Sequence, residues 1–119
     1  MIENDRNLAD EMNHYKPRDG ELAVWWMGQS GFLVKSRDCC ILFDPYLSTS
    51  LEDMTRNSPV IQHIRMMPIP VQPSWITCVD YILCSHDHKD HYDKDTVIPV
   101  LKANPGARIV VPFSARPSL

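Results

Sequence analysis

The chain contains 119 residues, of which 44% are hydrophobic, 8% aromatic and 23% charged, a composition typical of globular rather than disordered proteins. The 12 Lys and Arg residues against 15 Asp and Glu residues give a net charge of −3, so the sequence predicts no binding to nucleic acid or to anionic membranes. The length leaves room for one domain, which we place at 1–119.

Residues 1–20 are rich in charge and lack the apolar core of a secretory signal, and no later stretch is apolar for long enough to span a membrane. The four cysteines lie in apolar stretches and form no Cys-x-x-Cys pair; they are Cys39, Cys40, Cys78 and Cys84. We therefore expect a cytoplasmic protein whose cysteines are reduced, buried thiols rather than disulfides or ligands of a four-cysteine zinc site.

The first half of the chain predicts a helix followed by three strands. Within the N-terminal segment 1–20, residues 4–14 are expected to form a helix with Leu8 and Met12 on one face. Pro17 prevents the helix from continuing. Apolar runs predict the strands, at Leu22–Met27, Gly31–Lys35 and Cys39–Phe43. The Gly-Gln-Ser-Gly sequence between the first two runs is typical of a tight turn, so these strands are expected to form a hairpin.

Residues 46–74 predict a long loop, because four prolines interrupt any long helix: Pro59, Pro68, Pro70 and Pro73. A loop of this length is usually functional or mobile. Its Ile and Met side chains are expected to pack onto the rest of the protein: Ile61, Ile64, Met66, Met67 and Ile69. Arg65 is expected to be solvated, with contact to a substrate phosphate as the alternative.

The second half predicts a strand, a helix and a strand, at Tyr81–Cys84, 94–103 and Arg108–Val111. Asp93 or Asp95 is expected to cap the helix, and Pro99 is compatible with it only in the first turn. This order is typical of an α/β or layered α+β fold.

Three of the five histidines fall directly after the strand at 81–84, in the order His86-x-His88-x-Asp90-His91. In an extended segment, residues two apart point the same way, so His86 and His88 can bind one ion. If the chain then turns, Asp90 and His91 can bind a second ion nearby. The alternative is an incidental polar loop, and Asp87 is expected to be solvated, as is Lys89.

Imidazole and carboxylate ligands without thiolate suit Zn²⁺, and also Mn²⁺ or Fe²⁺. Two such ions bridged by water supply a nucleophile at neutral pH and stabilise a developing oxyanion. The sequence therefore predicts a site for up to two divalent ions and a hydrolytic activity.

His-x-His-x-Asp-His after a strand resembles the signature of the metallo-β-lactamase superfamily. Three further segments are similar to its L-ascorbate-6-phosphate lactonase-like branch: Trp25–Lys35, Ile41–Tyr46 and Val79–His86. The resemblance covers about residues 22–112 and implies an α+β fold, the αββα sandwich, with a metal site at its edge. It also implies a metal-dependent hydrolase of a lactone, ester or phosphoester in a small molecule, with a phosphorylated sugar lactone favoured.

The resemblance implies that His86 and His88 bind the first metal ion and that Asp90 and His91 bind the second. It makes Asp90 the catalytic residue that accepts the proton of the attacking water. It makes Asp44, which ends a strand, a group that supports the ligands; the alternative is a simple turn aspartate.

Members of the family supply further ligands from the second half of their fold, and no histidine follows His91 here. The sequence therefore resembles an N-terminal half of the sandwich. One alternative is a non-catalytic half-domain that binds metal and associates with a second copy. Others, within the same enzyme class, are a phospholipase D-like hydrolase and a nuclease, the latter disfavoured by the charge.

Overall fold

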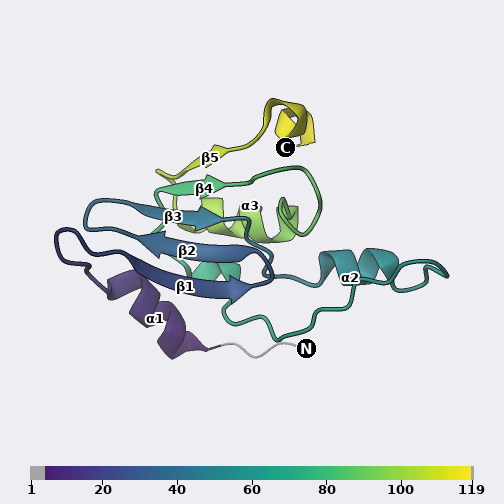
Figure 1. Cartoon of the computed structure of the whole chain (residues 1–119), viewed down its shortest axis with the longest axis horizontal. Coiled ribbons are helices and arrows are strands. Elements are labelled where there is room, and N and C mark those ends of the chain that lie inside the picture. The colour runs from purple at the N-terminus through teal and green to yellow at the C-terminus, as the bar shows by residue number, and fades with distance from the viewer. Residues whose placement is uncertain (1–4, 119) are drawn as a thin grey trace.

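The computed structural model describes residues 5–118. Its five strands form one mixed sheet in the order β1-β2-β3-β4-β5 (Figure 1). They are β1 (Ala23–Gly28), β2 (Gly31–Lys35), β3 (Cys40–Phe43), β4 (Tyr81–Leu83) and β5 (Arg108–Val110). All five predicted strands are confirmed, with ends that differ by no more than one residue, and the combination of helices with a mixed sheet confirms the α+β class.

The first three strands run antiparallel to their neighbours, and the predicted hairpin between β1 and β2 is confirmed. Its turn needs positive φ angles, which are 98° at Gly28 and 48° at Gln29. The strands β3, β4 and β5 are parallel, with Ile41 paired to Tyr81 and Tyr81 paired to Arg108. Because these strands run in one direction, their carboxyl ends meet at the same edge of the sheet.

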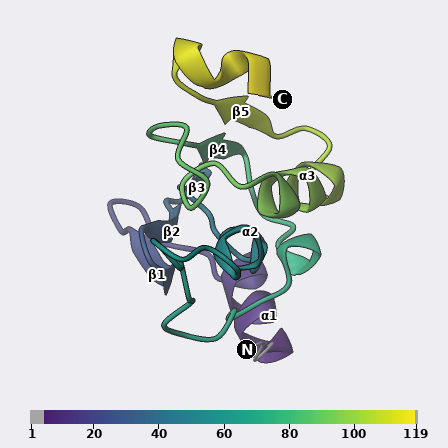
Figure 2. The same ribbon diagram turned by 90° about the vertical axis from the view of Figure 1, so that its right-hand side faces the viewer.

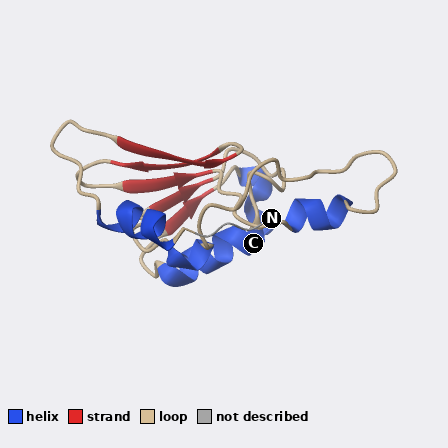
Figure 3. Cartoon of the chain, turned by 90° about the horizontal axis from the view of Figure 1, so that it is seen from below, coloured by secondary structure: helices blue, strands red, loops and turns tan. Residues whose placement is uncertain are grey.

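Three helical segments cover one face of the sheet (Figures 2 and 3). They are α1 (Arg6–His14), the 3-10 helix η1 (Pro73–Trp75) and α3 (Lys94–Ala103). The helix predicted at 4–14 is confirmed as α1, although residue 4 lies outside the described residues; Asp5 caps it by accepting a hydrogen bond from Leu8 N at 3.0 Å. Side chains from helices and sheet form the core between them, including Met12, Leu33, Leu42, Ile76, Ile82, Val97 and Val100.

The opposite face of the sheet carries apolar side chains that stay exposed. In-register pairs such as Val24 with Val34 and Trp26 with Phe32 place these side chains on one face. Trp26 is 56% exposed and Phe32 is 39% exposed. None of the helices described within 5–118 lies over this face (Figure 3).

The segment 46–74 is not the helix-free loop that the prolines indicate, because it contains α2 (Ser50–Thr55). This helix is short enough to end before Pro59. Ile69 packs into the core as expected, whereas Ile61, Ile64 and Met66 are exposed, so the packing expected of these three was wrong. The 3-10 helix η2 (Phe113–Ser118) follows β5.

The helix predicted at 94–103 is confirmed as α3, with Asp93 at its N-cap. Pro99 was expected in the first turn, but it lies in the interior of the helix. Its missing N–H leaves the carbonyl of Asp95 without a helical partner, and Asp95 is exposed, so water can satisfy that carbonyl. No helix in the described part of the chain is long and apolar enough to cross a membrane.

Candidate metal centre

The predicted motif lies at the carboxyl edge of the parallel strands, next to Asp44. Phe43 and Leu83 are paired at the ends of β3 and β4, and Asp44 N donates to the carbonyl of Leu83 at 2.9 Å. The residue after β3 therefore stands beside Ser85, which immediately precedes His86. Asp44 has a φ of 42°, a left-handed conformation that aspartate tolerates better than most residues.

The carboxylate of Asp44 accepts three hydrogen bonds. Its Oδ1 accepts from Ser85 N at 2.6 Å, and its Oδ2 accepts from Ser85 Oγ at 2.7 Å and from His91 Nδ1 at 3.0 Å. Burial raises the pKa of Asp44, but the hydrogen bonds from Ser85 and His91 outweigh it and the net pKa is lowered. Because the charged carboxylate of Asp44 can only accept a hydrogen bond, Nδ1 of His91 carries the ring proton. Nε2 of His91 is then free to bind a metal.

Three imidazole rings converge beside this carboxylate. The ring centroid of His86 lies 4.5 Å from that of His88 and 4.0 Å from that of His91. His86 Nε2 and His88 Nδ1 are 3.1 Å apart, close to the separation of about 3.3 Å expected for two nitrogens on one tetrahedral zinc ion. Ser85 Oγ lies 2.8 Å from His86 Nδ1 and so links this ring to Asp44.

The motif folds back on itself because the chain turns after His88. The amides of His91 and Tyr92 both donate to the His88 carbonyl at 2.9 Å. This turn places His91 against His86, whereas the carboxylate of Asp90 stays 3.7 Å from His91 Nε2. Asp87 and Lys89 are exposed, as expected.

The donor set fits a divalent ion in its chemistry, since imidazole nitrogen and carboxylate oxygen are the ligands that Zn²⁺, Mn²⁺ and Fe²⁺ accept. The distance between the ring nitrogens of His86 and His88 also fits two ligands of one ion. Among residues 5–118, no three His, Cys, Asp or Glu side chains are arranged to hold one ion. The structure thus brings two ligands together, with His91 beside them.

Sequence reasoning missed Ser85, whose hydroxyl and amide both bind Asp44. Its position directly between the strand and His86 is the signal that indicates it. Sequence reasoning also missed the role of Asp93, which is only 3% exposed. Its carboxylate accepts from three hydroxyls at 2.6–2.7 Å and so joins the segment before α2 to α3; the donors are Ser48, Ser50 and Thr96.

Arg65 was expected to be solvated, but it is 5% exposed. Its guanidinium donates to the carbonyls of Tyr46 at 2.7 Å and Met67 at 3.0 Å, and it lies over the Tyr46 ring. A Cβ at Gly28 would stand 3.1 Å from Arg65 Nη2. Arg65 therefore fastens the segment 46–74 against the β1–β2 turn, which sequence alone does not reveal because the carbonyl acceptors become available only on folding.

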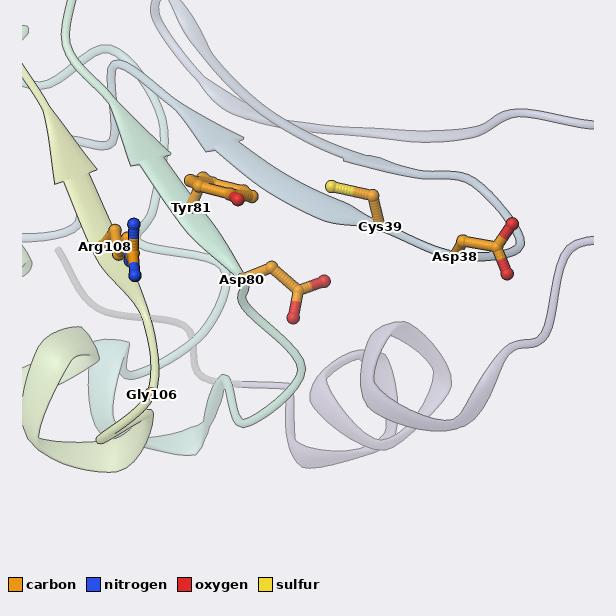
Figure 4. Close-up of a pocket in the computed structure, with 6 residues that line it drawn as sticks. All are labelled: Asp38, Cys39, Asp80, Tyr81, Gly106 and Arg108. Carbon is orange, nitrogen blue, oxygen red and sulfur yellow. The ribbon is translucent and has the colours of Figure 1, made fainter.

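Two cavities lie at opposite ends of the sheet. One of about 310 Å³ adjoins the motif and is lined by Ser50, Met54, Lys89, Tyr92, Asp93, Lys94 and Asp95. The other, of about 330 Å³, lies at the amino ends of the parallel strands and is lined by Asp38, Cys39, Asp80, Tyr81, Gly106 and Arg108 (Figure 4). Only the first is next to the histidines.

Replacing Asp44 by alanine is expected to weaken Zn²⁺ binding by about 10–100-fold, because His91 loses the group that orients it. It should also lower the free energy of unfolding by about 1–3 kcal/mol, since the amide and hydroxyl of Ser85 lose their acceptor. Zinc titration and urea unfolding measure the two effects.

Asp44→Asn is the matched control, because asparagine tolerates the positive φ and keeps an oxygen for Ser85 N. Its amide nitrogen donates to His91 Nδ1 and moves the ring proton to Nε2. We expect this variant to regain stability but not zinc affinity. Wild-type zinc binding in both variants would mean that Asp44 is only a turn residue.

The sequence of the chain is similar to those of known proteins. The sequence model of the beta-lactamase superfamily domain matches residues 23–112. Uncharacterized proteins of Mycobacterium bovis and Mycobacterium tuberculosis are 37% identical over 89 residues, which are 75% of this chain and 23% of each relative. A probable L-ascorbate-6-phosphate lactonase of Salmonella paratyphi B is 26% identical over 80% of this chain and 31% of its own length.

The chain therefore spans less than a third of the length of these relatives. The family match covers most of the chain and includes every strand of the sheet together with the histidine motif. By sequence and by fold, this chain belongs to the beta-lactamase superfamily.

Proposed function

We propose that the chain forms part of a metal-dependent hydrolase that cleaves a lactone, ester or phosphoester of a small molecule at the carboxyl edge of the sheet. The observation that carries the proposal is the cluster in which Asp44, through Ser85 and His91, orients imidazoles beside His88. A divalent ion bound there, Zn²⁺ in our proposal and Mn²⁺ or Fe²⁺ as alternatives, would polarise the substrate and lower the pKa of a water nucleophile.

The residues of the chain have separate tasks in this proposal. His86 and His88 bind the ion, and His91 presents its Nε2 nitrogen because Asp44 holds its Nδ1 proton. Asp90, whose side chain is 29% exposed, would bind a second ion and accept the proton of the attacking water.

An anionic substrate such as a phosphorylated sugar lactone is supported by two considerations. Lys89 and Lys94 line the 310 Å³ cavity beside the motif, together with Asp93 and Asp95. The name of the Salmonella paratyphi B relative contains a phosphorylated lactone. We also propose a cytoplasmic location, which rests on the reduced cysteines.

The test is turnover by the purified chain, loaded with Zn²⁺ or Mn²⁺, of a sugar-phosphate lactone, an aryl ester, bis-p-nitrophenyl phosphate and a phospholipid. We expect hydrolysis that His88→Ala abolishes and Lys89→Ala reduces only for the phosphorylated substrate. A preference for the diester or for a phospholipid would favour the nuclease or the phospholipase D-like alternative. Equal rates for wild type and His88→Ala would contradict hydrolysis by this chain.

A second candidate function is a non-catalytic metal-binding domain that associates with another copy, and the exposed apolar face of the sheet favours it. Val24 is 57% exposed and Trp26 is 56% exposed on β1, an edge strand of the sheet. Sedimentation equilibrium should then show a dimer that Trp26→Lys dissociates and that Val60→Lys, at an 85% exposed loop position, leaves intact. A monomeric wild type would contradict this candidate.

A further inference from the structure

The side chains of Cys40 and Cys78 meet at the end of the sheet opposite the histidines. Cys40 begins β3, and Cys78 lies in the segment that leads into β4. Their sulfur atoms are 3.6 Å apart, within hydrogen-bonding distance for two sulfurs, and both are free thiols. Cys40 is 2% exposed, whereas Cys78 is only half-buried.

The surrounding backbone fixes this contact. Asp80 N donates to the Cys40 carbonyl at 2.9 Å, and Cys40 N donates to Asp80 Oδ2 at 2.8 Å. The amides on either side of Cys78 donate to the side-chain oxygens of Asn13 at 2.9 Å and Asn104 at 3.0 Å. The two cysteines are therefore held together by their framework and not by mobile side chains.

The charges around the pair favour one thiolate and one thiol. A hydrogen bond from Cys40 lowers the pKa of Cys78 to about 7, and the nearby Lys35 ammonium lowers it further, against the opposing effects of burial and Asp80. The same hydrogen bond and burial raise the pKa of Cys40. Lys35 is paired with Cys40 in the β2–β3 register and donates to the carbonyls of Met12 and Asn13, which fixes its ammonium group.

We propose that Cys40 and Cys78 form a redox-active dithiol that a hydroperoxide oxidises to an intrachain disulfide, a modification site separate from the metal centre. The half-exposed Cys78 thiolate attacks one peroxide oxygen; the O–O bond breaks, the leaving oxygen takes a proton to become water or an alcohol, and Cys78 becomes a sulfenic acid. The Cys40 sulfur then attacks the Cys78 sulfur. The S–O bond breaks, the S–S bond forms, and the Cys40 proton leaves with a second oxygen as water.

The two sulfurs supply the two electrons that reduce the peroxide. Closing the bond requires them to approach from 3.6 Å to about 2.05 Å. The product links β3 to the segment before β4, and an added thiol returns it to the reduced pair.

The other cysteines provide matched controls. Cys39 lies on the face of the sheet away from the helices and lines the cavity at the amino ends of the strands (Figure 4). Cys84 is buried at the far end of β4, where burial raises its pKa to about 12. The sulfur of Cys78 contacts that of Cys40, so neither Cys39→Ser nor Cys84→Ser is expected to prevent the oxidation.

The test treats the reduced 119-residue chain with hydrogen peroxide in the presence of a chelator, which excludes oxidation catalysed by bound metal. We expect the intact mass to fall by two hydrogen atoms and peptide mapping to show the Cys40–Cys78 link in wild type, Cys39→Ser and Cys84→Ser. Dithiothreitol should restore the starting mass. Cys78→Ser should lose the reaction altogether.

Cys40→Ala should stop at a sulfenic acid on Cys78 that dimedone traps, which shows the order of the two steps. If the alanine variant does not fold, protection of Cys40 and Cys78 from alkylation in oxidised wild type still shows that these two thiols form the disulfide. A Cys39–Cys78 link, links only between chains, or four thiols that survive peroxide would each overturn the proposal.

Discussion

Replacing both His86 and His88 by alanine is expected to lower the affinity of the chain for Zn²⁺ by at least about 100-fold. Loss of a group that only orients a metal ligand lowers metal affinity by about 10–100-fold. This variant loses two of the ligands themselves. The measurement is competition with a chromophoric zinc chelator, followed for wild type and variant at the same pH.

The matched control is the double variant His14→Ala and His63→Ala, which removes the same number of imidazoles from exposed positions elsewhere in the chain. It should bind Zn²⁺ as tightly as wild type. If both double variants lose affinity equally, the zinc binds nonspecifically to histidines and the motif is not a site.

Replacing Ile82 by alanine is expected to lower the free energy of unfolding by about 2–5 kcal/mol, the range for truncating a buried branched side chain. Ile82 is the central residue of β4 and is 0% exposed between the sheet and the helices. Since the carboxyl end of β4 leads directly to the histidines, the same variant should also weaken zinc binding. Urea unfolding, followed by tryptophan fluorescence, gives the first quantity.

Ile98→Ala is the control for this prediction, because Ile98 lies on α3 with 41% of its surface exposed. Its change in unfolding free energy should stay within about 0.5 kcal/mol. Equal losses for Ile82→Ala and Ile98→Ala would contradict the arrangement of the core.

The strands were predictable from sequence because their apolar runs are short and end at residues that interrupt the hydrogen bonding between strands. The turn at Gly28, where φ is 98°, has a local cause that the sequence displays directly. The interior position of Pro99 was not predictable, since it depends on Asp95 lying at the surface, where water replaces the missing hydrogen bond. The short helix α2 was likewise hidden by the prolines around it.

The candidate site was predictable in its residue types but not in its contacts. Sequence spacing placed His86 and His88 together, and Asp44 was implied only by the family resemblance. The structure brings all three to one edge of the sheet. The stacking of His91 on His86 arises from the turn at His88, which no local pattern indicates. Such contacts are set by side-chain rotamers and by strand register, and neither is encoded in the spacing of a motif.

The burial of Arg65 is another feature that could not be predicted from the sequence. An isolated arginine in a polar, proline-rich segment is usually solvated, yet here backbone carbonyls and the Tyr46 ring surround it. Tyr46 lies 19 residues away from Arg65 in the sequence, so only the folded chain brings its carbonyl and ring to the guanidinium.

X-ray absorption at the zinc edge of the zinc-loaded chain tests most directly whether the histidine motif is the metal centre. We predict a shell of nitrogen and oxygen ligands at about 2.0–2.1 Å, with the scattering pattern of at least two imidazoles, and this pattern should disappear in the His86→Ala, His88→Ala variant. A sulfur shell at about 2.3 Å, which would place the ion on the cysteines, would contradict it.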